Sequence, residues 1–116
     1  MNRRDLDRLR QLADLHKDHK LAKLRAAIDA RTRSEEALAA LALPMPRDAG
    51  LLGAAADLAG LAYQRWADIR RAEINLDLAS QMRDVIAARA EAEHAFARSE
   101  ALASLANRQK PPQGKG

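Results

Sequence analysis

Two closely spaced prolines separate this chain into two long helix-forming segments. They lie in the run Pro-Met-Pro-Arg-Asp-Ala-Gly at residues 44–50. Proline lacks the backbone donor that a helix interior needs, and it disfavours the helical conformation of the residue before it. A helix that starts near the N-terminus is therefore expected to end near Leu43. Asp48 can then cap a second helix, because its carboxylate can accept hydrogen bonds from the free amides of the first turn.

The composition excludes a sheet. Hydrophobic residues make up 47% of the 116 residues, but they are mostly Ala and Leu, and aromatic residues reach only 3%. Residues that favour strands are nearly absent, and such small side chains suit a narrow seam between helices better than a globular core. The predicted fold is all-α: an antiparallel two-helix coiled-coil hairpin with a longer second helix and a disordered basic C-terminal tail.

The predicted hairpin occupies residues 1–107 as a single domain. Its helices are expected over 3–43 and 49–107, joined by a turn over 44–48, and the Pro- and Gly-rich run 108–116 is expected to be a disordered tail. Asn2, three residues before Asp5, predicts a weak N-terminal cap for the first helix.

Apolar residues recur three or four positions apart in both segments, which is the spacing of one helix face. In the first helix the stripe comprises Leu6, Leu9, Leu12 or Ala13, His16, Leu21, Leu24, Ile28, Leu38, and Leu41 or Ala42. In the second helix it comprises Leu51, Ala55, Leu58, Ala62, Trp66, Ile69, Leu76, Ala79, Ile86 and Ala90, with Leu78, Met82, Val85 and Phe96 beside it. Arg31 and Glu35 interrupt the first stripe, so the seam is expected to be weak or wet there.

A short turn would leave the end of the second helix without a partner. In an antiparallel pair of helices, the residue numbers of any two facing positions add up to the same value. If Leu41 lies near residues 53–56, that value is about 94 to 97. Residues 95–107 would then protrude, carrying Phe96, Leu102 and Leu105 as exposed apolar contacts for a partner. The alternative is that this end is frayed or self-associating.

Charge is concentrated at the same end. Residues 1–33 hold ten basic and five acidic residues, and Arg108, Lys110 and Lys115 add three positive charges, whereas residues 34–107 sum to −4. Such a basic end is suited to an acidic partner, although solvated helix faces account for most individual charges. The predicted basic partner-binding residues are Arg3, Arg4, Arg8, Arg10 and Arg108.

Catalytic and cofactor motifs are missing from the sequence. The chain has no cysteine, the serines lie in helical pattern without an elbow turn, and the glycines form no phosphate loop. His16 and His19 are three positions apart, and Glu91 and His94 form a Glu-x-x-His spacing, but the expected register separates the two pairs along the helices. We therefore expect no enzyme activity, metal or cofactor. Packing is favoured over binding for Tyr63 and Trp66.

Membrane insertion and nucleic-acid binding are also disfavoured. The first residues contain no apolar segment of a signal peptide, and the longest uncharged run is half of a membrane span. The pI of about 10.0 is compatible with binding to nucleic acid. However, aspartates interleave with the basic residues of the first helix, and no aromatic residue is placed for base stacking. A cytoplasmic protein without a nucleic-acid partner is expected.

The first helix contains the runs Leu6-x-x-Leu9-x-x-Leu12-Ala13, Ala22-x-Leu24 with Ile28, and Ser34-Glu35-Glu36-x-Leu38-x-x-Leu41. In these runs it resembles the N-terminal helix of the FliJ/YscO family of flagellar and type III secretion stalk proteins. The runs Asp48-Ala49-Gly50-Leu51 and Ala106-Asn107-Arg108-Gln109 are also similar. The chain is shorter than typical members, and the aromatic and Gln-rich positions of the family's gate contact are not matched over residues 62–73.

The resemblance implies a cytoplasmic antiparallel coiled coil whose terminal end enters the pore of a hexameric export ATPase. It also implies contacts with the export gate or with chaperones, and proximity to a membrane only through these partners. The expected function is therefore a non-enzymatic stalk or adaptor of a bacterial export apparatus. The alternatives are a general coiled-coil scaffold or homodimer, and then a nonspecific nucleic-acid binder.

Overall fold

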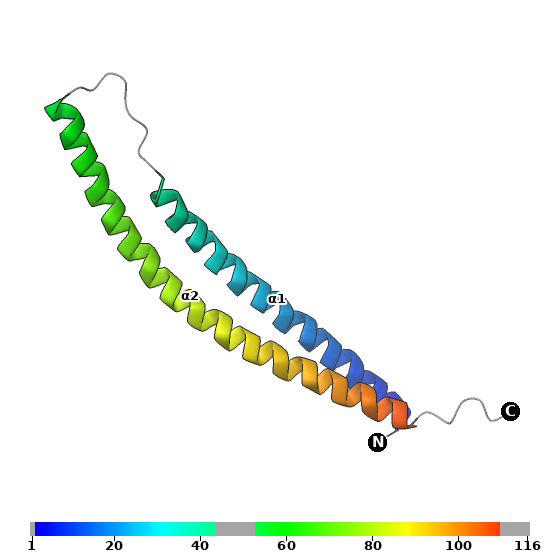
Figure 1. Ribbon diagram of the computed structural model, residues 1–116. Coiled ribbons are helices and arrows are strands. Elements are labelled where there is room, and N and C mark those ends of the chain that lie inside the picture. The colour runs from blue at the N-terminus through cyan, green and yellow to red at the C-terminus, as the bar shows by residue number, and fades with distance from the viewer. Residues whose placement is uncertain (1, 44–52, 110–116) are drawn as a thin grey trace. The chain divides into compact units, whose positions relative to one another are not determined.

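The described part of the chain consists of two α-helices. The computed structural model describes residues 2–43 and 53–109, and within these ranges it contains α1 (Arg3–Leu41) and α2 (Ala54–Gln109) and no strand (Figure 1). The all-α prediction is confirmed, and the second helix is the longer one. The predicted turn over 44–48, the cap Asp48 and the tail beyond Gln109 lie outside the described residues.

Both ends of α1 follow from local hydrogen bonds. The side-chain Oδ1 of Asn2 accepts a hydrogen bond from the backbone N–H of Asp5 at 2.8 Å, so the predicted cap is confirmed. At the other end, the N–H of Leu43 donates to the carbonyl of Ala40 at 3.3 Å, which is the tighter i to i+3 spacing. The helix therefore ends at Leu41, two residues before the predicted end.

Gly53 begins α2. Its φ of +66° lies in the left-handed region that other residues rarely adopt, and its carbonyl accepts a hydrogen bond from the N–H of Asp57 at 3.1 Å. The helix continues to Gln109, two residues beyond the predicted end. Arg108 therefore belongs to the helix and not to the predicted tail.

The chain divides into two compact units, and both helices contribute to each. The terminal unit contains residues 1–27 and 84–116, and the internal unit contains residues 28–83. In the terminal unit, the start of α1 and the end of α2 carry the buried side chains. These are Leu6 and Ala13 on α1 and Val85, Ala92, Ala95, Ser99 and Ala106 on α2. Most of them are small, so this seam allows the two helix backbones to approach closely.

Contacts in the terminal unit define a register that differs from the predicted one. Asp14 is hydrogen-bonded to Ser99, and Lys20 to Glu91. The two residue numbers of each pair add up to 113 and 111, whereas the predicted register requires 94 to 97. The predicted overhang of residues 95–107 is therefore wrong, because this segment packs its buried residues against α1.

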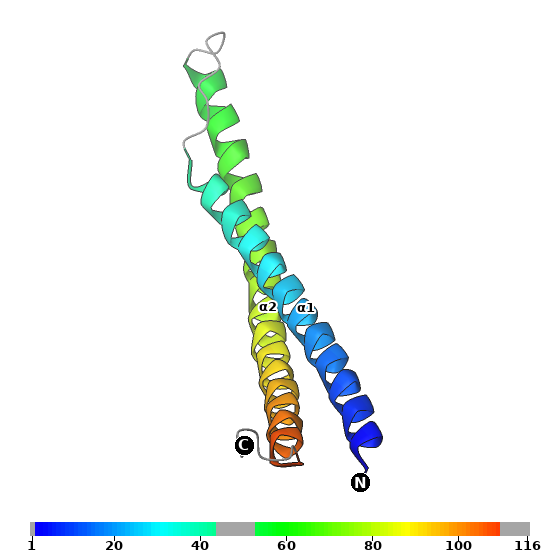
Figure 2. The same cartoon turned by 90° about the vertical axis from the view of Figure 1, so that its right-hand side faces the viewer.

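In the internal unit, the end of α1 packs against the middle of α2. Leu41 forms a buried cluster with Ala67 and Ile74, and the side chain of Arg71 donates to the Leu41 carbonyl at 3.3 Å. The first turns of α2 continue past the end of α1 (Figures 1 and 2). The predicted register failed for this reason, since it placed Leu41 beside residues 53–56.

The stripe predicted to face α1 on the second helix is also wrong. Leu58, Trp66, Ile69, Leu76 and Ile86 are all exposed. The residues of α2 that are buried lie at other positions of the same helix, namely Ala67, Ile74, Val85, Ala92, Ala95, Ser99 and Ala106. Most large apolar residues of α2 are thus exposed, and the seam uses mostly small residues together with Ile74 and Val85.

Candidate protein-binding surface

Basic side chains occupy part of the seam in the terminal unit. Arg10, Lys17 and Lys20 are half-buried, and they share the three- and four-residue spacing of the buried Leu6 and Ala13. Long basic side chains can cover small apolar residues with their methylene stems while the charged end stays in water. The seam of this unit therefore combines half-buried basic side chains of α1 with the buried apolar residues of both helices.

The charged ends of these side chains meet specific partners on α2. Lys20 Nζ lies 3.2 Å from Glu91 Oε2, and Lys23 Nζ lies 4.0 Å from the same oxygen. Lys17 Nζ lies 5.9 Å from the centroid of the Phe96 ring, within the range of a cation–π contact. Three consecutive lysines of α1 are thus held by two residues of α2.

Glu91 is the acidic centre of this cluster. A hydrogen bond from Lys20 and the positive charges of Lys20 and Lys23 lower the pKa of its carboxyl group below the usual value. Partial desolvation acts in the opposite direction and is the weaker effect. Glu91 therefore stays ionised to lower pH in the folded chain than in the unfolded chain.

Ser99 is the one polar residue among the buried residues of the described chain. Its hydroxyl donates to Asp14 Oδ1 at 2.6 Å, and Lys17 Nζ lies 4.0 Å from the same carboxylate oxygen. The buried hydroxyl thus has a hydrogen-bond partner, and a bond to a charged acceptor is stronger than one to a neutral acceptor. This contact helps to fix the register of the terminal unit.

The three apolar residues predicted to bind a partner do not form one surface. Phe96 and Leu105 are 52% and 43% exposed, whereas Leu102 is half-buried. Nine positions separate Phe96 from Leu105, which is two and a half turns of helix, so they lie on opposite sides of α2. Phe96 contacts a basic residue, because Lys17 Nζ lies over its ring.

The predicted basic residues all lie in the terminal unit. Arg3, Arg4, Arg8 and Arg108 are exposed, and Arg10 is half-buried. The terminal unit holds thirteen basic and eight acidic residues, a net charge of +5, whereas the internal unit holds seven and eight, a net charge of −1. A net positive charge is thus found only in the unit that contains residues 1–27 and 84–116.

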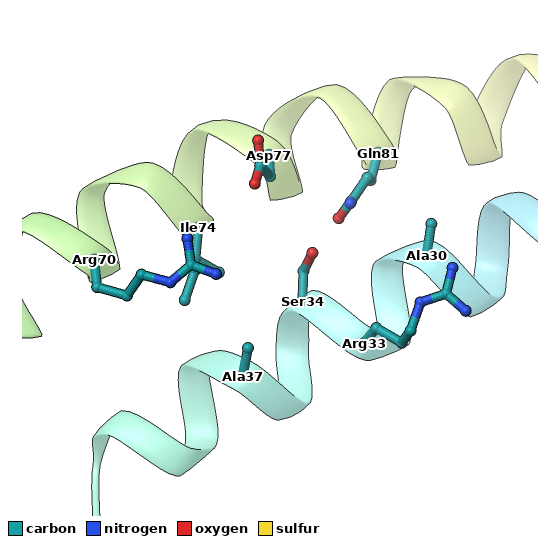
Figure 3. A pocket seen from close by; sticks show the side chains of 8 residues that line it. All are labelled: Ala30, Arg33, Ser34, Ala37, Arg70, Ile74, Asp77 and Gln81. Atoms are coloured by element: carbon teal, nitrogen blue, oxygen red, sulfur yellow. The ribbon is translucent and has the colours of Figure 1, made fainter.

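A small open cavity interrupts the seam of the internal unit. Its volume is about 240 Å³, and it is lined by Ala30, Arg33, Ser34, Ala37, Arg70, Ile74, Asp77 and Gln81. Figure 3 shows Ser34 of α1 and Gln81 of α2 pointing toward the space between the helices. The cavity agrees with the weak or wet seam predicted around Arg31 and Glu35.

Two polar atoms beside this cavity are buried without a hydrogen bond to any described residue. They are Gln81 Oε1 and Arg31 Nε. Arg31 Nε lies 3.2 Å from Glu35 Oε1, which is close enough for an ion pair but lacks hydrogen-bond geometry. Leaving such groups unsatisfied costs free energy, so this part of the seam is weakly stabilised.

Sequence reasoning missed the half-buried lysines and arginine of the seam. These residues belong to a seven-residue repeat that runs through positions 6, 10, 13, 17, 20 and 24. The repeat was not recognised because half of these positions carry charged rather than apolar residues. Tyr63 packs against the internal cluster, as predicted. Trp66 does not: it is exposed, with its ring centroid 5.7 Å from that of Tyr63.

Residues 2–43 and 53–109 contain no group of three or more His, Asp or Glu side chains placed to hold a metal ion. Neither of the two helices has an apolar stretch long enough to cross a membrane. In comparisons with known proteins, no protein-family model matches the chain, and neither does any curated protein or solved structure.

Proposed function

We propose that this chain is a non-enzymatic antiparallel coiled-coil hairpin that serves as a stalk or adaptor in a bacterial flagellar or type III export apparatus. Its terminal unit would bind the hexameric export ATPase in the cytoplasm. The export gate and chaperones are further partners that the resemblance implies. The proposal rests on the resemblance of α1 to the stalk family and on the charge of the terminal unit.

The observation that carries the proposal is the uneven distribution of charge. The terminal unit has a net charge of +5 and exposes four of the five predicted arginines, whereas the internal unit has a net charge of −1. Long-range attraction to an acidic ring would speed encounter and orient this unit toward it. The half-exposed ring of Phe96 would supply apolar contact after docking.

The hairpin itself is supported by the pairing contacts. In the terminal unit Asp14 meets Ser99 and Lys20 meets Glu91. In the internal unit Leu41 meets Arg71. Within the terminal unit the residue numbers of the two pairs add up to 113 and 111, which supports an antiparallel pairing of its two helix segments. Burial at three- and four-residue intervals is the spacing of a coiled coil.

A charge-reversal experiment tests the proposed docking end. Arg4→Glu with Arg8→Glu should weaken binding to a hexameric export ATPase about 10-fold at low salt and flatten its salt dependence. The matched control is Arg65→Glu with Arg83→Glu, which makes the same change of net charge at exposed positions of the internal unit. Affinity is measured by biolayer interferometry with the native chain as reference.

Two outcomes would contradict the proposal. One is that the native chain does not bind the ATPase at low salt. The other is that both double variants lose the same affinity, because net charge alone would then account for binding and the terminal unit would have no special role.

A further inference from the structure

An apolar stripe on α2 faces away from α1 in the internal unit. The stripe, called the outer stripe below, comprises Leu58, Ala62, Ile69, Ala72 and Leu76. The three large side chains are 67%, 62% and 74% exposed. With Arg65, the positions follow alternating intervals of four and three residues, which is the repeat by which one helix packs along another.

The contacts of α1 leave the outer stripe uncovered. Within the described chain, α1 packs on α2 through Leu41 against Ala67 and Ile74. Ile69 is two positions from Ala67, more than half a turn around the helix. Exposed apolar surface of this extent and regularity marks an interaction site.

The occupant that fits the outer stripe is another helix of similar length. The stripe extends over 19 residues, about 27 Å of helix. The longest stretches of the sequence outside the described residues are 44–52 and 110–116, of nine and seven residues, and each contains two prolines. Neither is long enough to form a helix of this length.

We propose that the outer stripe binds the outer stripe of a second copy of this chain, forming a two-fold symmetric antiparallel dimer through α2. A self-complementary contact of this kind covers both outer stripes at once. The proposal does not depend on the proposed function, which uses the terminal unit.

Charge favours a second copy over a strongly charged partner. Residues 54–81 hold three basic and four acidic residues, so two copies of this segment carry almost no net repulsion. The terminal unit, at +5, would repel its own copy. Self-association is therefore expected at the internal unit.

The exposed area is sufficient for a modest dimer. The large aliphatic side chains of the stripe and the neighbouring Trp66 expose on the order of 400 Å² per copy. Two copies, with their alanines and flanking polar residues, reach the roughly 1,000 Å² that a specific interface needs. The expected dimer is thus reversible and dependent on concentration.

Sedimentation equilibrium of the full chain tests this proposal, over a range of about 1 to 500 μM. The native chain should shift from monomer to dimer, and the emission of its single tryptophan, Trp66, should shift to shorter wavelength over the same range. The variant Ile69→Gln with Leu76→Gln should weaken dimerisation at least about 100-fold. Glutamine is a good helix former, so circular dichroism should show unchanged helix content.

The matched control is Leu12→Gln, at a leucine of α1 that is 63% exposed and lies outside the outer stripe. It should dimerise like the native chain. Three results would overturn the proposal: a native chain that stays monomeric throughout, a dimer that the double variant does not weaken, or equal weakening by the control. A Trp66 emission that stays constant while dimers form would do the same.

Discussion

Glu91 lies in a more positively charged environment than an ordinary surface carboxylate. It accepts a hydrogen bond from Lys20 and lies within 4.0 Å of Lys23. Because these contacts favour the ionised form, the pKa of Glu91 is lower in the folded chain than in the unfolded chain. Its stabilising contribution is complete above the ordinary glutamate pKa and is lost as the pH falls through the lower folded value.

Glu91→Gln should therefore lower the thermal midpoint of unfolding at pH 7 by a small amount, as expected for a solvent-exposed ion pair. The difference from the native chain should shrink as the pH falls below about 4 and should also shrink in 1 M salt. Thermal melts followed by circular dichroism between pH 3 and pH 7 measure it. Glu93→Gln is the control, since Glu93 is exposed and makes no ion pair within the described residues. A Glu91→Gln effect that stays constant over this pH range would contradict the assignment.

The two helices differ in how apolar residues are distributed around them. In α1, most buried positions were predicted from a single stripe that contains Leu6, Leu24 and Leu41. In α2, Ile74 lies in the seam while Ile69 and Leu76 are exposed. The same residue type on the same helix therefore contributes to packing at one position and is open to solvent at another.

This contrast can be measured with one substitution at two positions. Ile74→Ala should destabilise the chain by about 2 to 4 kcal/mol, because Ile74 is 2% exposed and the surrounding helices cannot fill the space. Ile69→Ala should change the stability of the monomer by less than about 1 kcal/mol. Urea unfolding at a protein concentration well below dimer formation gives both values. Equal losses would mean that the assignment of the seam on α2 is wrong.

The helices could be predicted from the sequence because local residues determine their ends. Pro44 and Pro46 limit α1, and Asn2 caps it. The face of α2 could not be predicted, because hydrophobic periodicity selects the stripe with the largest side chains, and the seam instead uses small ones such as Ala67, which is 1% exposed. The register failed together with the face, since both depend on which residues of α2 meet Leu41.

For the candidate surface, the sequence predicted the part of the chain in which it lies but not which side chains meet one another. Its residues fall in the terminal unit because they are near the chain ends in sequence. Which of them share a side of α2 follows from the helical repeat, and Phe96 and Leu105, nine positions apart, lie on opposite sides. The contact of Lys17 with Phe96 was missed because a lysine in a seam position interrupts the apolar pattern that identifies a seam.

At the scale of the whole molecule, the proposed hairpin predicts which pairs of introduced cysteines can be crosslinked. The chain has no cysteine, so introduced thiols react without competition. Asp14→Cys with Ser99→Cys should give a crosslinked monomer with a short bismaleimide, because the two native side chains are hydrogen-bonded at 2.6 Å. Gel electrophoresis under denaturing conditions resolves the looped product.

The comparison variant is Asp14→Cys with Met82→Cys, the pair that a residue sum of 96 would bring together. This variant should not be crosslinked under the same conditions. Efficient crosslinking of this pair, or none at positions 14 and 99, would contradict the register described above.

The lysines of the chain have a consequence for covalent regulation. All five lie in the terminal unit, whereas the positive charges of the internal unit are exclusively arginines. Acylation of lysine amines would therefore neutralise charge in the terminal unit alone, and at Lys20 it would remove the hydrogen-bond partner of Glu91. Amine chemistry would thus weaken one half of the helix pairing and leave the other half chemically untouched.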